Sequence, residues 1–129
     1  MGINYYNSLL LYAILETDVN NCGFNLVDII AFIDWANHAI MTYDEYNNGI
    51  NYLLDNNLIE EKDEKYSVTN EFKEWFNDIN KNKKRIYLHK AIENIEKYLN
   101  DIASIKTLNN KRIIISKEDY ENSIKEYKK

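Results

Sequence analysis

The chain contains no proline and only three glycines, Gly2, Gly23 and Gly49, in 129 residues. Tight turns between strands depend on these two residue types, so an all-β fold with many short connections is disfavoured. The hydrophobic fraction of 45% is large enough for one compact core. We therefore expect a single small unit made mainly of α-helix.

Charge divides the chain at residue 80. Residues 1–80 carry three basic and fourteen acidic side chains, a net charge of −11, whereas residues 81–129 carry thirteen basic and seven acidic ones, a net charge of +6. Such asymmetry is typical either of a basic arm that binds nucleic acid or of two surfaces that neutralise each other, within one chain or between chains.

Apolar periodicity predicts two helices at the start of the chain, over residues 5–17 and 26–37. Asn25 can serve as the N-cap of the second. A third helix is predicted from Thr42, because Thr42 and Glu45 have the spacing of a capping box. It should end at Asn56-Asn57, residue types that tolerate a left-handed exit.

Gly49 lies inside this third helix, where a glycine costs about 1 kcal/mol relative to alanine. We expect another helix to pack closely against it. Two short strands around residues 62–64 follow, and Thr69 is the expected cap of a fourth helix. This helix carries apolar residues at helical spacing, namely Phe72, Trp75, Phe76 and Ile79.

The basic half begins with a cationic stretch and continues in a predicted helix over residues 83–104. Its apolar residues are spaced by four and three positions, as in the seam of a paired helix: Leu88, Ile92, Ile95, Leu99 and Ile102. The seam either closes over the open side of residues 1–80 or pairs with its twin in a dimer. A short strand at residues 113–115 and a last helix capped by Ser116 complete the prediction.

Three helices followed by two strands around a short turn is the order of a winged helix-turn-helix domain. Residues 42–76, TYDEYNNGINYLLDNNLIEEKDEKYSVTNEFKEWF, resemble the third helix, wing and following helix of bacterial members of that superfamily. The fold class expected is thus mainly α with a small β-hairpin wing. Residues 1–80 would be the winged-helix domain and residues 81–129 a basic C-terminal extension with a long helix, a short strand and a terminal helix.

The resemblance implies DNA binding, with the third helix in the major groove. Its outward residues would then be the recognition surface: Asp44, Glu45, Asn47, Asn48, Asn51, Tyr52 and Asp55. The asparagines can pair with adenine, but this helix has no Lys or Arg and three carboxylates would oppose the phosphates. Cations that could compensate form a predicted basic patch: Lys81, Lys83, Lys84, Arg85 and Lys90. Tyr87 and Tyr98 could stack on unpaired bases beside it.

No pattern in the chain predicts catalysis or a cofactor. Cys22 is the only cysteine, and with His38 and His89 it forms no ligand set at zinc spacing. The pairs Asp34/His38 and His89/Glu93 have the i, i+4 spacing of one helix face, which we interpret as surface hydrogen bonds. There is no phosphate-binding glycine loop and no nucleophile elbow. We expect neither an enzyme nor a bound metal.

Three hypotheses follow for function. The favoured one is a non-catalytic, cytoplasmic winged-helix module that binds a protein partner or a second copy of itself, with the acidic helical face and the basic half as complementary surfaces. The alternative is a DNA-binding transcriptional regulator with an acidic recognition helix, and the third, an enzyme, is the least favoured. Trp35 and Trp75 are both predicted to lie in the core.

Overall fold

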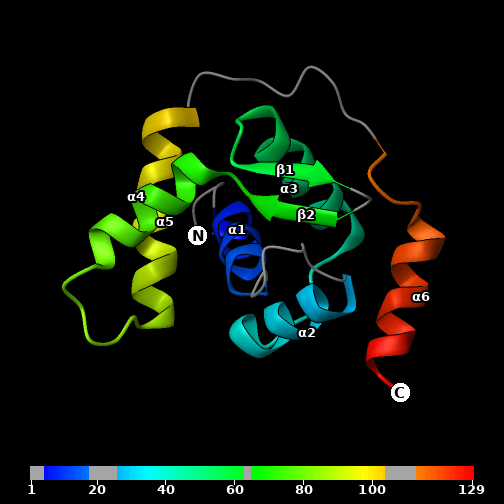
Figure 1. The fold of residues 1–129 in the computed structure, drawn as a ribbon. Helices are drawn as coiled ribbons and strands as arrows, with labels where there is room; N and C mark the ends of the chain where they lie inside the picture. Colours follow the sequence, from blue (N-terminus) through cyan, green and yellow to red (C-terminus); the bar gives the residue numbers. More distant parts are fainter. Residues whose placement is uncertain (1–4, 18–25, 63–64, 104–112) are drawn as a thin grey trace.

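The computed structural model describes residues 5–17, 26–62, 65–103 and 113–129. Within these ranges the chain forms six helices and one two-stranded antiparallel hairpin (Figure 1). The elements are α1 (Tyr5–Thr17), α2 (Leu26–Asn37), α3 (Tyr43–Asp55), β1 (Ile59–Lys62), β2 (Lys65–Val68), α4 (Asn70–Asn80), α5 (Leu88–Ala103) and α6 (Lys117–Tyr127). The mainly helical architecture with one small hairpin was predicted from the sequence. The expected N-cap Asn25 lies outside the described residues.

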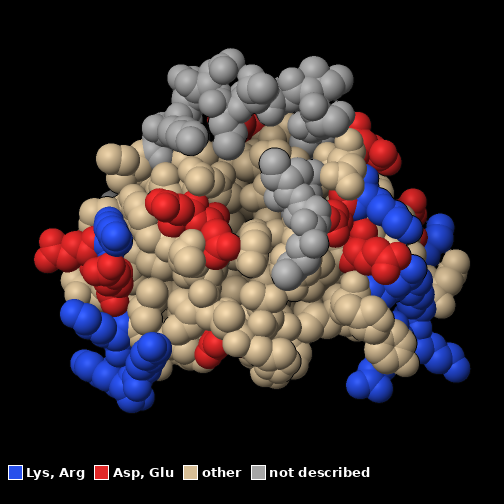
Figure 2. Space-filling model, turned by 180° about the vertical axis from the view of Figure 1, so that it is seen from behind, with Lys and Arg blue, Asp and Glu red and all other residues tan. Residues whose placement is uncertain are grey.

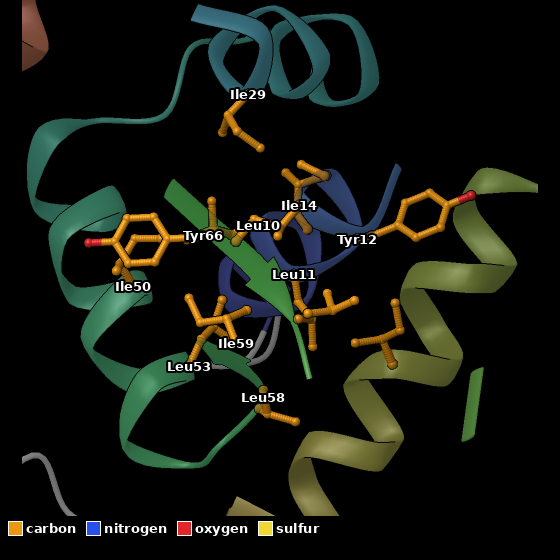
Figure 3. Packing of buried hydrophobic residues seen from close by; sticks show 14 of the residues in the cluster. Leu10, Leu11, Tyr12, Ile14, Ile29, Ile50, Leu53, Leu58, Ile59 and Tyr66 are labelled. Atoms are coloured by element: carbon orange, nitrogen blue, oxygen red, sulfur yellow. The ribbon is translucent and has the colours of Figure 1, made fainter. Parts of the chain in front are cut away.

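Helix α1 lies at the centre of the core. Every residue from Ser8 to Ile14 is buried, because this helix is apolar on all sides rather than along one stripe. Helices α2, α3 and α5 and strand β2 pack around it. Figure 3 shows side chains of α1, α3 and the hairpin meeting in this core, among them Leu10, Leu53 and Tyr66.

Helix α3 begins and ends as predicted. The Thr42 hydroxyl accepts from the Glu45 amide, and the Glu45 carboxylate accepts from the Thr42 amide at 2.9 Å, which completes the capping box. Asn57 has a φ of 57° at the exit. The expected close packing at Gly49 is also present, since a Cβ atom there would lie 2.8 Å from Cδ2 of Leu10 on α1.

The hairpin leads directly into α4. Ile59 pairs with Val68 and both are buried, so one face of the hairpin closes the core. Thr69 does not cap α4 through its side chain, contrary to the prediction. Its hydroxyl instead donates to the carbonyl of Asn57 at 2.9 Å, which joins the end of the hairpin to the exit of α3.

Helix α5 begins at Leu88, later than the predicted residue 83. Residues 83–87 bear no apolar stripe, and a short helical segment without a buried face has little to stabilise it. Helix α5 itself packs against α1. Its seam residues Ile92, Ile95 and Leu99 are buried within the same chain, and Leu88 is half-buried.

Of the two arrangements expected for α5, the one in which the helix closes over residues 1–80 is present within the chain. Three residues of the predicted dimer seam, Ile92, Ile95 and Leu99, are buried in this way. The side chain of the fifth seam residue, Ile102, lies outside the described residues.

The C-terminal segment packs against the same core. Residues 113–115 form no strand, contrary to the prediction. Their backbone groups form hydrogen bonds with side chains of α3 instead of with another strand. Helix α6 is capped by Ser116 as expected and lies against α2 and α3 (Figure 1). Tyr120 from α6 is only 1% exposed. Both helices described after residue 80, α5 and α6, therefore pack against the first eighty residues.

Candidate interaction surfaces

Much of the α3 surface predicted to contact DNA bases is buried or hydrogen-bonded within the chain. Asn51 is fully buried, and its amide donates to the carbonyl of Asn47 at 2.9 Å. Tyr52 is buried as well. Neither side chain can reach a base edge in this structure, which corrects their assignment to the outward face.

The C-terminal segment covers the first turns of α3. The side-chain oxygen of Asn47 accepts from the amide of Ile114 at 2.8 Å, and the Tyr43 hydroxyl donates to the carbonyl of Ile115 at 2.7 Å. Tyr120 stacks on Tyr46 with ring centroids 5.2 Å apart. Part of the expected recognition surface is thus an internal interface.

The rest of the predicted α3 surface is acidic. Asp44 and Asn48 are exposed, whereas Glu45 and Asp55 are half-buried. Glu45 is engaged in the capping box. The accessible part of α3 therefore combines one neutral amide with carboxylates, an arrangement that repels phosphate.

The predicted basic patch is exposed throughout. Lys81 and Lys90 each form a surface ion pair, with Asp78 at 3.6 Å and Glu93 at 3.3 Å. Lys90 and Lys97 hold the pKa of Glu93 below its ordinary value. In contrast, three consecutive cations form no ion pair with any described residue: Lys83, Lys84 and Arg85. In the view of Figure 2, basic side chains gather at two separate edges of the face, with largely uncharged surface between them.

A cavity of about 420 Å³, which we call the turn pocket, opens at the α4–α5 connection. Arg85 lies over the ring of Tyr87, 5.4 Å from its centroid, and this ring is 58% exposed. Tyr98 is not part of the pocket, because it packs against Trp75 with centroids 4.2 Å apart, and burial raises its pKa. The lining residues are Asn80, Lys83, Lys84, Arg85, Ile86, Tyr87, Lys90, Ala91 and Asn94.

A second hollow of about 470 Å³ lies between the end of α1 and the outer side of α2, and we call it the α2 surface. Trp35 is 68% exposed there, which corrects its predicted place in the core. Trp75, in contrast, is partly buried as expected. The α2 surface consists of Glu16, Thr17, Asp28, Ala31, Phe32 and Trp35.

Aromatic rings connect the α2 surface to the core. Trp35 contacts Phe32 at 5.8 Å between centroids, and Phe32 packs edge-on against Tyr12 at 5.9 Å. Burial and the nearby Glu16 carboxylate raise the pKa of Tyr12 to about 12. Trp35 is therefore a surface ring supported from beneath by packed aromatics.

The predicted pairs at i, i+4 spacing have other partners. Asp34 accepts from the hydroxyl of Tyr127 on α6 at 2.7 Å, and this bond raises the pKa of Tyr127. His38 lies beyond the end of α2 with a φ of 57°. Glu93 is paired with lysines rather than with His89. Among the described residues, no three His, Cys, Asp or Glu side chains gather in a group that could hold a metal ion.

Comparisons of the chain with protein-family models, with curated proteins and with solved structures found no match. In the parts of the chain that the structure describes, no helix combines the length and apolar character needed to cross a membrane.

Proposed function

We propose that this chain is a non-catalytic protein-interaction module of winged-helix type, and that its α2 surface receives a basic segment of a partner protein or of a second copy. The winged-helix assignment is supported by the order of α1 to α4 and by the hairpin that follows the left-handed exit at Asn57. The observation that carries the function is the exposure of Trp35 beside two carboxylates.

The chemistry of the α2 surface favours a cationic partner. An indole face attracts Arg and Lys through its quadrupole, by roughly 0.5–1 kcal/mol at exposed sites. Glu16 and Asp28 are both exposed at the rim and add direct charge attraction. Because large aromatic side chains are enriched at the centre of protein interfaces, a Trp that is 68% exposed is a natural anchor.

The alternative, a DNA-binding regulator, draws on the resemblance and on the exposed basic patch. Binding through α3 would place Asp44 against phosphate and would require the C-terminal segment to leave Asn47. These features favour the protein-interaction module.

A fluorescence titration tests the proposal. In a Trp75→Phe background Trp35 is the only indole, so we would titrate a peptide copying residues 81–87, KNKKRIY, and separately measure sedimentation at rising protein concentration. We expect peptide binding that weakens with salt and is lost in Asp28→Asn. A Trp35→Ala variant should also lose peptide binding, which is then measured through a label on the peptide because this variant lacks the indole. Ile113→Ala, which removes an even more exposed apolar side chain from another surface, should leave peptide binding unchanged.

Two results would overturn this proposal. One is the absence of any binding by the peptide together with a monomer at every concentration. The other is sequence-specific retardation of duplex DNA that depends on the exposed Asn48, which would establish the regulator instead.

A further inference from the structure

The turn pocket is electrostatically one-sided. Four of its lining residues are cationic and, among the described residues, none is acidic, although the chain has 21 acidic side chains and a net charge of −5. Lys83, Lys84 and Arg85 lack ion-pair partners in the described part of the chain. Like charges held this close repel one another, so an anion bound between them would be favoured by direct attraction.

An exposed ring stands beside these cations. Tyr87 is 58% exposed, and the guanidinium of Arg85 lies 5.4 Å from its centroid. A cation over one side of an aromatic ring restrains its orientation. The exposed part of the ring is then a prearranged surface on which a planar group can stack.

Two amides and an apolar floor complete the pocket. Asn80 is 8% exposed, and its Nδ2 donates to the carbonyl of Phe76 at 2.8 Å, which fixes the orientation of the amide. Asn94 is half-buried on the facing side of α5, and the buried Ala91 adds apolar surface. Amides carry both donors and acceptors, which suits the mixed edge of a nucleobase. The volume of about 420 Å³ lies within the range of small-molecule sites.

We propose that the turn pocket binds a nucleotide, whose phosphate lies beside Lys83 and Lys84 and whose base stacks on Tyr87. The same chemistry occurs in a free nucleotide and at the end of a nucleic-acid strand. Phosphate alone would use the cations but not the ring. The turn pocket lies apart from the α2 surface, and its test does not involve Trp35.

Calorimetric titrations of the full chain test this site with three probes: AMP, inorganic phosphate and a short single-stranded oligonucleotide with a 5′-phosphate. We expect AMP to bind more tightly than phosphate and to weaken as salt rises. Tyr87→Ala should weaken AMP binding by about tenfold, the size that loss of one stacked ring produces, and leave phosphate binding unchanged. Tyr87→Phe, which keeps the ring, should bind AMP nearly as the parent does.

The cations are tested by a matched pair of double variants. Lys83→Ala with Lys84→Ala should weaken both AMP and phosphate, whereas Lys125→Ala with Lys128→Ala removes the same charge from exposed positions at the far end of α6 and should change neither. If the oligonucleotide binds more tightly than AMP and depends on Tyr87 in the same way, the site is assigned to the ends of nucleic-acid strands. If AMP binds more tightly, the site is assigned to free nucleotides. Failure of both to bind, equal affinity for AMP and phosphate, or indifference to Tyr87→Ala would overturn the proposal.

Discussion

The backbone amide of Ile114 donates a 2.8 Å hydrogen bond to the side-chain oxygen of Asn47 on α3. The two residues are 67 positions apart, and Asn47 belongs to the helix face expected to read DNA. A residue type suited to a base edge is here used to hold the C-terminal segment of the same chain. Asn47 therefore contributes to the integrity of the fold.

Asn47→Ala should therefore destabilise the protein. It removes the acceptor of a partly buried amide, which costs about 0.5–1.5 kcal/mol. Asn48→Ala is the matched control, because Asn48 is the exposed neighbour and surface changes usually stay within about 0.5 kcal/mol. Denaturant unfolding of both variants measures the difference. Equal stabilities would mean that the docking of the C-terminal segment adds nothing measurable.

Tyr120→Phe tests the attachment of α6. The Tyr120 hydroxyl donates to the carbonyl of Met41 at 2.6 Å in a buried position, and its ring stacks on Tyr46. The substitution keeps the ring and leaves the carbonyl unpaired, so we expect a loss of about 1–3 kcal/mol. Tyr127→Phe, also on α6, removes a partly buried hydrogen bond to Asp34 of α2 and should cost less. The reverse order in thermal unfolding would contradict this description of α6.

The same tyrosine predicts a response to alkaline pH. Burial, and then the nearby Glu45 carboxylate, raise the pKa of Tyr120 from 10.0 to about 12, which favours the neutral phenol in the folded chain. Its contribution is complete below pH 10, the ordinary pKa of tyrosine, and is lost as the pH rises towards about 12. Melting temperatures should fall over this window. The fall should be shallower in Tyr120→Phe, and parallel curves would show that Tyr120 does not contribute.

Ile95→Ala distinguishes packing within the chain from packing between copies. Ile95 is fully buried in the layer between α5 and α1, so its truncation should cost about 2–5 kcal/mol. Because the contact lies inside one chain, the loss should not depend on protein concentration. Ile86→Ala, at a position 39% exposed, is the control. A loss that disappears at high concentration would instead place Ile95 in a dimer interface.

Local rules predicted the elements well, because their causes lie within a few residues. The capping box of Thr42 and Glu45 and the left-handed exit at Asn57 depend on neighbours in sequence. The exposure of Trp35 was missed, although it lies two residues beyond the buried Ile33 and so about 200° around the helix. The attachment of Ile114 to α3 depends on tertiary packing, which no local pattern reveals.

The candidate sites likewise combine features that the sequence predicts with features that depend on tertiary packing. The exposed cations around Lys84 were predicted from the charge run alone. The cavity beside them depends on tertiary structure, because it is lined by Asn80 from α4 and by Ala91 and Asn94 from α5. A charge run indicates where a surface is basic, but its shape follows from residues far from the charges.

Gly49→Ala tests the close approach of α1 and α3. Alanine should stabilise a helix interior by about 1 kcal/mol relative to glycine. Here the new Cβ would lie 2.8 Å from Cδ2 of Leu10 and 3.4 Å from the side-chain oxygen of Asn7. Leu10 is fully buried and has little room to move, and overpacking of a core costs about 1–3 kcal/mol. We therefore expect a net loss of about 1 kcal/mol in denaturant unfolding. Adding Leu10→Val, which shortens the opposing side chain, should cost less in the alanine variant than in the parent. A gain in stability from Gly49→Ala alone would show that the two helices can separate at little cost.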